Sequence, residues 1–161
     1  STPCIISWGG RVKRPGSIVH QPAQFVDIMA TCCELAGTEY PAEYRGRAIQ
    51  PLEGVSLLPV VAGRSLPRRM IFAEHEGNRM VRSGKWKLVS ANSRGDVWEL
   101  YDISRDRTEC HDLSERHPRK VRKLESAYFE WADRCDVLYF PTVWNTYNKG
   151  RSKDIKSYLT K

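Results

Sequence analysis

The sequence predicts a fold that passes from α/β to α+β: a strand with helices, then a small domain in which a long helix packs on a four-stranded antiparallel sheet. Short apolar runs separated by turn residues recur between residues 71 and 101. A regular amphipathic helix then begins at Pro118. A polar linker at residues 64–69 separates both from an earlier helical segment, so we place a domain boundary after residue 66.

The first predicted element is a single buried strand at residues 4–8. The sequence Cys-Ile-Ile-Ser-Trp favours β-structure, and Gly9 and Gly10 end the run. No partner strand lies nearby in the sequence, so we expect this strand to pair with something outside the chain.

Two helices are predicted before the linker. Residues 22–37 carry apolar side chains at three- and four-residue steps, between a proline that suits a first turn and a glycine that suits a C-terminal stop. Asp27 is expected to cap a segment that starts at residue 28, by accepting hydrogen bonds from the N–H groups two and three positions later. Residues 56–63 are expected to form a short helix with Ser56 as its N-cap.

The strands of the small domain are expected to follow one another as a meander. Trp86 and Leu88 alternate with lysines, which is the pattern of a strand with one buried and one solvated face. The helix from Pro118 carries its apolar residues three and four positions apart, so we expect it to cover the buried face. That apolar stripe comprises Val121, Leu124, Tyr128, Trp131, Cys135 and Leu138. The side chains it would bury are Trp86, Leu88, Trp98 and Leu100.

Charge and cysteine content limit the class of protein. The net charge is +7, and only six of the 26 basic residues lie in residues 1–66. The basic tail at 141–161 either favours polyanions or is simply solvated, and the solvated interpretation is the simpler one. The five cysteines are an odd number without a Cys-x-x-Cys spacing, which indicates neither a complete disulfide framework nor a zinc site. Cys32 and Cys33 are interpreted as small core residues, and no apolar run is long enough to predict a membrane span.

Several phrases of the sequence resemble the C-terminal region of the arylsulfatase family. Residues 72–88 read Phe-Ala-Glu-His-Glu-Gly-Asn-Arg-Met-Val-Arg-Ser-Gly-Lys-Trp-Lys-Leu, and Glu-Leu-Tyr-Asp follows at 99–102. Upstream, residues 54–63 match the family's Gly-x-Ser-Leu-x-Pro-x-x-x-Gly, whereas Ala30 replaces a proline of the family pattern. The resemblance extends over about residues 2–135 in the expected order.

The resemblance implies a domain organisation. Residues 1–66 would be the C-terminal remnant of a large alkaline-phosphatase-like α/β domain, residues 67–140 the small C-terminal domain, and residues 141–161 a basic tail. The implied partners are the catalytic N-terminal sulfatase domain and a sulfated small molecule or glycan, with no specific nucleic acid. A periplasmic or secreted parent is implied as well.

The resemblance also implies chemistry that this sequence does not carry. Family members hydrolyse sulfate esters with a formylglycine, made within Cys/Ser-x-Pro-x-Arg, beside a calcium ion held by Asp and Asn oxygens. None of the five cysteines stands in that motif, and the family's Asp-Asn and Asp-Asp pairs are absent. We therefore assign no catalytic and no metal-binding residue here, and we expect the isolated chain to be inactive. Formylglycine and calcium are expected only in a full-length parent.

Four residues remain as candidates for the substrate cleft: His75, Glu76, Asn78 and Arg79. In the resembling enzymes the small domain borders the cleft, where an Arg or His would bind a sulfate or a sugar hydroxyl through charge-assisted hydrogen bonds. In the competing interpretation residues 76–78 only form a tight turn and Arg79 pairs with Glu74. The remaining histidines, His20, His111 and His117, are interpreted as exposed structural residues.

An alternative function is a free-standing module that binds sulfated glycan or nucleic acid. The basic second half and the aromatic strands would then form an open binding platform. Trp86 and Trp98 distinguish the two hypotheses, because they should be covered by the final helix in a sulfatase domain and exposed on such a platform.

Overall fold

The computed structural model describes residues 2–95, 97–138 and 140, and its contacts divide the chain into two units, residues 1–68 and 69–161. The predicted boundary after residue 66 concerns the domains of a longer parent and stays a prediction. The predicted basic tail at 141–161 lies outside the described residues.

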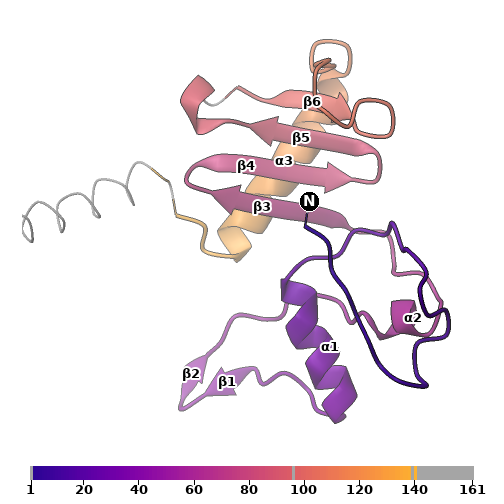
Figure 1. Ribbon diagram of the computed structural model, residues 1–161. Coiled ribbons are helices and arrows are strands. Elements are labelled where there is room, and N and C mark those ends of the chain that lie inside the picture. Colours follow the sequence, from indigo (N-terminus) through magenta and orange to yellow (C-terminus); the bar gives the residue numbers. More distant parts are fainter. Residues whose placement is uncertain (1, 96, 139, 141–161) are drawn as a thin grey trace, which may run out of the picture. The chain divides into compact units, whose positions relative to one another are not determined.

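The second unit is built on a four-stranded antiparallel sheet with the strand order β3-β4-β5-β6 (Figure 1). The strands are β3 (Met70–His75), β4 (Asn78–Ser83), β5 (Trp86–Ser90) and β6 (Glu99–Asp102), with the short 3₁₀ helix η1 (Asn92–Arg94) before β6. Each strand pairs with its neighbour in sequence, because two tight turns join the first three strands directly. The predicted meander is confirmed.

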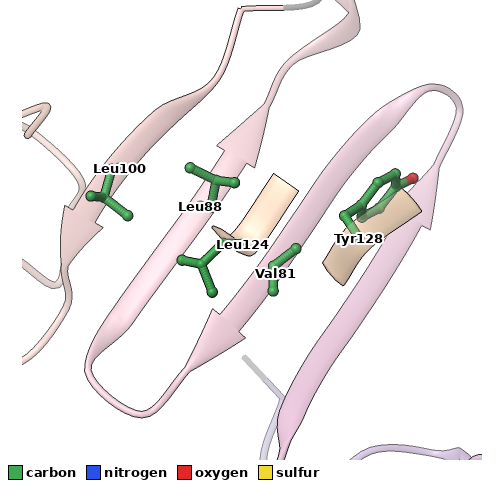
Figure 2. Packing of buried hydrophobic residues seen from close by; sticks show 5 residues of the cluster. All are labelled: Val81, Leu88, Leu100, Leu124 and Tyr128. Carbon is green, nitrogen blue, oxygen red and sulfur yellow. The ribbon is translucent and has the colours of Figure 1, made fainter. Parts of the chain in front are cut away.

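Helix α3 (Pro118–Arg134) crosses one face of this sheet and forms the core with it (Figure 1). Figure 2 shows Val81, Leu88 and Leu100 of the three adjacent strands packed against Leu124 and Tyr128 of α3. The three strand residues are completely buried. Removing one such side chain from water contributes roughly 1.5–3 kcal/mol, so this cluster is the main source of stability in the unit.

Partly buried aromatic residues surround the cluster, and they include both tryptophans that distinguish the two hypotheses. Trp86 and Trp98 are half-buried and pack against the cluster. Phe72 of β3 stacks on Trp131 of α3, with ring centroids 5.3 Å apart and an interplanar angle of 7°. The sheet face under α3 is therefore a packed core face, which is the arrangement expected for a sulfatase domain.

The end of α3 differs from the prediction. The apolar stripe was expected to continue to Leu138, but the helix ends at Arg134 and Cys135 caps it by donating its N–H to the Trp131 carbonyl. Asp136 then adopts a left-handed conformation with φ of 51°, which turns the chain away. As a result, Leu138 is 68 % exposed.

The first unit contains helix α1 (Val26–Ala36), the short helix α2 (Leu58–Val61) and a two-residue hairpin, β1 (Glu43–Tyr44) with β2 (Arg47–Ala48). The predicted strand at residues 4–8 does not form within this chain, and its pairing with a partner outside the chain stays a prediction. These residues are irregular and exposed, and Ile5 is 93 % exposed. A strand needs a hydrogen-bonding partner, and none pairs with this segment among the described residues.

Asp27 has a different role from the predicted helix cap. Its carboxylate is fully buried and accepts hydrogen bonds from the backbone N–H groups of Gln24 and Val55, which lie before the helix and far along the chain. The helix accordingly starts at Val26 rather than at residue 22. The N-cap of α2 is Leu57 and not the predicted Ser56, although Ser56 Oγ accepts the N–H of Leu58 at 3.2 Å.

The surface of the first unit is unusually apolar. Cys32 is exposed and Cys33 is half-buried, so the expectation that both are core residues is not met within this unit. Large apolar side chains along and before α1 are at least half exposed: Phe25, Ile28, Met29 and Leu35. Such a surface is typical of one that is covered by another part of a protein.

Candidate functional site

The four candidate residues lie at the turn between β3 and β4, at one end of the sheet (Figure 1). Glu76 and Gly77 both have positive φ, 52° and 81°, which matches the twist that a two-residue hairpin requires. The N–H of Gly77 donates to Glu74 Oε1 at 2.7 Å. A Cβ at Gly77 would stand 2.9 Å from Cγ of Asn92 and 3.0 Å from Cβ of Phe140, so only glycine fits here.

Asn78 braces the hairpin rather than pointing freely into solvent. Its side-chain amide donates to the carbonyl of His75 at 2.9 Å, and its Oδ1 accepts the N–H of Asn92 at 3.1 Å. The first bond closes the turn, and the second ties the turn to the segment between β5 and β6. The tip of the hairpin is therefore fixed from both sides.

Arg79 lies against aromatic rings on the α3 side of the sheet. Its guanidinium carbon is 5.8 Å from the ring centroid of Trp98 and 6.0 Å from that of Phe129. Cation–π contacts of this kind contribute about 0.5–1 kcal/mol at exposed sites and more where water is excluded. Arg79 also stands directly opposite Glu74 in the strand register, as the competing interpretation requires.

The sheet separates the four candidates between its two faces. His75 and Asn78 are register partners, so their side chains share the face opposite α3, whereas Arg79 lies on the face that α3 covers. His75 and Glu76 are exposed at the tip. The structure thus brings His75, Glu76 and Asn78 together and places Arg79 behind them.

Two residues of this site were missed by the sequence analysis. Asn92 contacts the hairpin although it is 14 positions from Asn78, and no local pattern in the sequence pointed to this contact. Phe129 interrupts the charged face of α3 and is 50 % exposed. An aromatic residue on the polar side of an amphipathic helix was the available signal for a second contact surface.

The residues described here do not provide a metal centre. Across residues 2–95, 97–138 and 140, no group of three or more His, Cys, Asp or Glu side chains is arranged to hold a metal ion. A calcium ion prefers six to eight oxygen ligands. The calcium of the resembling enzymes therefore does not fit any cluster in this part of the chain.

None of the helices in the described part of the chain combines the length and the apolar character that crossing a lipid bilayer requires.

Comparison with known proteins places these observations in a family. Residues 1–130 match the family model described as N-sulphoglucosamine sulphohydrolase, C-terminal. An uncharacterized sulfatase of Schizosaccharomyces pombe is 28 % identical over 163 residues, which cover 98 % of this chain and 29 % of that protein. The chain thus spans less than a third of that relative.

Solved structures share the fold. The crystal structure of Ps i-CgsB superposes with a TM-score of 0.57 and 22 % identity, over 71 % of this chain and 25 % of that one. The structure of BT4656, in complex with its substrate D-glucosamine-2-N,6-O-disulfate, superposes with a TM-score of 0.50 and 24 % identity, over 67 % of this chain and 23 % of that one.

Proposed function

This chain belongs to the N-sulphoglucosamine sulphohydrolase C-terminal family, and from that premise we propose that it is the C-terminal part of an arylsulfatase-type sulfuric ester hydrolase. The match over residues 1–130 is the observation that carries the proposal. The chain supplies structure and one wall of the substrate cleft, while the nucleophile and the metal ligands belong to a catalytic N-terminal domain. A sulfated small molecule or glycan is the substrate class.

The exposed apolar side chains of the first unit support a partner domain. Phe25 is 83 % exposed and Ile18 is 82 % exposed, next to the half-exposed apolar residues of α1. Burying one such side chain contributes roughly 1.5–3 kcal/mol to the free energy of folding or association. A surface that covers them would therefore stabilise the unit considerably. The catalytic domain of the proposed parent is that surface, and residues 4–8 gain a strand partner there.

The hairpin tip supports a role in substrate binding. His75 presents an exposed imidazole, and Asn78 holds the carbonyl of His75 through the 2.9 Å hydrogen bond. This bond fixes the backbone at the tip, and the exposed imidazole can donate a hydrogen bond to a sulfate oxygen or a sugar hydroxyl. Asn78 is then a positioning residue, because its side-chain amide donates to the carbonyl of His75 and its Oδ1 accepts the N–H of Asn92.

The first experiment tests the purified 161-residue chain with a chromogenic aryl sulfate in the presence of calcium. We expect no turnover, because no cysteine of the chain stands in the formylglycine motif. Ser65-Leu-Pro-Arg-Arg69 has the serine form of its spacing, but the described residues contain no group of side chains that could hold the metal ion beside it. Sulfatase activity that copurifies with the chain would refute the proposal that the nucleophile and the metal ligands belong to the N-terminal domain. Reading the coding sequence upstream of residue 1 for Cys-x-Pro-x-Arg tests the proposed parent independently.

The second experiment changes His75 in the parent enzyme. His75→Ala should lower kcat/KM by about tenfold or more, since a hydrogen bond to a charged group is worth roughly 1.5–3 kcal/mol. The matched control is His20→Ala, which changes an exposed histidine of the first unit and should leave kcat/KM unchanged. If both variants had the same kcat/KM and the same melting temperature, the proposed role of His75 in substrate binding would be refuted.

The free-standing binding module is less well supported. It required Trp86 and Trp98 on an open platform, whereas both are half-buried against the core under α3.

A further inference from the structure

A second cluster of functional groups lies at the end of the sheet opposite the β3–β4 hairpin, around the turn between β4 and β5 (Figure 1). A cavity of about 480 Å³ opens there between this turn, the loop after β6 and the start of α3. Ligand pockets usually measure about 300–1,000 Å³, so the space is sufficient for a monosaccharide-sized molecule. Trp86 forms part of its wall, together with Leu113.

Positive charge is concentrated around Trp86. The ammonium groups of Lys85 and Lys120 lie 5.0 and 4.6 Å from its ring centroid, and the ring of His117 meets it edge-on at 5.1 Å. The indole ring thus contacts two cations that come from different elements of the fold. Arg105 and His111 add a guanidinium and a second imidazole to the cavity wall.

The two carboxylates of the cavity are already engaged by donors of the protein. Asp102 Oδ2 accepts a hydrogen bond from the Lys85 ammonium at 2.6 Å. Its Oδ1 accepts both the backbone N–H and the hydroxyl of Ser104. Asp106 accepts the backbone N–H groups of Cys110 and His111 at 3.1 and 2.8 Å. Both carboxylates therefore organise the loop after β6 and have few lone pairs left for a ligand.

The cations, in contrast, keep hydrogen-bond donors available. Among the described residues, neither Lys120 nor Arg105 takes part in an ion pair or a side-chain hydrogen bond. Lys85 uses one of its three N–H donors on Asp102. The cavity wall thus presents the donors of Lys85 and Arg105 beside engaged acceptors. Lys120 is not part of that wall, but its ammonium lies 4.6 Å from the ring centroid of the wall residue Trp86. Available donors and positive charge next to engaged acceptors are the combination that recognises an anion.

We propose that this cavity binds a tetrahedral oxyanion, a sulfate or phosphate monoester, with Lys120 and Arg105 contacting the anion and Trp86 contacting the body of the ligand. The site is separated from the hairpin tip by the length of the strands, so it does not rest on the proposed function. Its ligand would be held rather than turned over, because nothing in the cavity takes part in the sulfatase chemistry proposed above.

The test is a titration of the full 161-residue chain, followed by amide and indole signals in ¹H–¹⁵N NMR spectra. The probes are glucose 6-sulfate, glucose 6-phosphate and, as a carboxylate control, sodium acetate, all at constant ionic strength. We expect saturable shifts centred on Trp86 and Lys120 with one or both monoesters, and weaker binding of acetate. The sulfate and phosphate arms decide which ester is preferred.

Variants separate this pocket from general attraction to a basic protein. Lys120→Met and Arg105→Gln should each weaken monoester binding by about tenfold while leaving the Lys85–Asp102 pair intact. Arg94→Gln removes one charge at the other end of the sheet, where Arg94 pairs with Glu99, and should change nothing. Each variant is first shown to melt as the unaltered chain does.

Three outcomes would overturn the proposal. The first is the absence of saturable shifts with either monoester. The second is equal weakening by Arg94→Gln and Lys120→Met, which would indicate screening of net charge. The third is acetate binding as tightly as the esters, which would contradict recognition of a tetrahedral oxyanion.

Discussion

A hydrogen bond of 2.9 Å joins the Asp27 carboxylate to the backbone N–H of Val55, across 28 positions of the chain. The same carboxylate accepts the N–H of Gln24 at 2.7 Å, immediately before α1. Asp27 is fully buried, so these bonds replace its hydration. One side chain therefore fixes both the start of α1 and the segment that leads into α2.

Asp27→Ala should destabilise the first unit strongly. The substitution leaves two partly buried N–H groups without their acceptor, and an unsatisfied group costs up to about 1–3 kcal/mol when it is fully buried. Hydrogen exchange of the Val55 amide should accelerate, and the urea midpoint should fall. Glu34→Ala, on an exposed position of the same helix, is the control. An unchanged exchange rate at Val55 would show that the carboxylate is not what protects it.

Gly54→Ala should destabilise the same junction for a steric reason. A Cβ at position 54 would stand 2.1 Å from the carbonyl oxygen of Val26 and 2.8 Å from the amide nitrogen of Asp27, and these backbone atoms of α1 have little room to yield. Overpacking of this kind costs roughly 1–3 kcal/mol. Gly9→Ala is the matched control, because nothing lies within 4 Å of its added Cβ. Equal melting temperatures for the two variants would contradict the close approach.

The second unit could be predicted largely from the sequence because its determinants are local. Trp86 and Leu88 alternate with lysines, and this period of two identifies the strand and its buried face. Each strand pairs with the next one along the chain, so the order of the strands in the sequence predicts their pairing. Leu124 and Tyr128 are four positions apart on α3 and are both buried against the sheet. A period of 3.6 residues thus identified the buried face of the helix.

The first unit was predicted less well because its determinants lie far apart in the chain. The run at residues 4–8 has strand composition, but composition does not supply a pairing strand. Asp27 has the residue type of a helix cap, yet its partner Val55 is visible only in three dimensions. The hairpin of β1 and β2 was missed because two residues per strand leave no periodicity, although Arg45 and Gly46 form a turn with positive φ.

The candidate site was predicted only in part, because its turn depends on local residues whereas its other contacts join distant parts of the chain. The turn at residues 76–78 followed from its residue types, and Gly77 adopts the expected left-handed conformation. The contact of Arg79 with Phe129 depends on how α3 crosses the sheet, which no local pattern encodes. The cavity beside Trp86 was not predicted at all, since His117 meets that ring from 31 positions away.

Leu88→Ala should be among the most damaging substitutions in the second unit. Leu88 is completely buried at the centre of the cluster in Figure 2, and truncation of such a leucine typically costs about 2–5 kcal/mol. Leu138→Ala makes the same chemical change at a site that is 68 % exposed and should have little effect. Urea unfolding of both variants compares the two positions. A loss at Leu138 as large as that at Leu88 would contradict the core assignment.

The pair of Lys85 and Asp102 should make stability depend on pH in the acid range. The pKa of Asp102 is lowered from 3.8 to about 2, chiefly by the hydrogen bond from Lys85 and then by those from Ser104. A carboxyl whose pKa is lower in the folded state stabilises the fold above its unfolded pKa. That contribution is lost as the pH falls from about 4 to about 2, where the folded state takes up its proton as well.

Lys85→Met removes the main cause of this pKa shift, so Asp102 should then titrate closer to its ordinary value. Urea unfolding at several pH values between about 6 and 2 should show a variant that is less stable near neutrality. The gap to the unaltered chain should narrow as the pH falls. Lys123→Met, an exposed lysine of α3, controls for the change in net charge. A gap that stays constant across this range would mean that Lys85 stabilises the fold by packing on Trp86, where its ammonium lies 5.0 Å from the ring centroid, rather than through the Asp102 carboxylate.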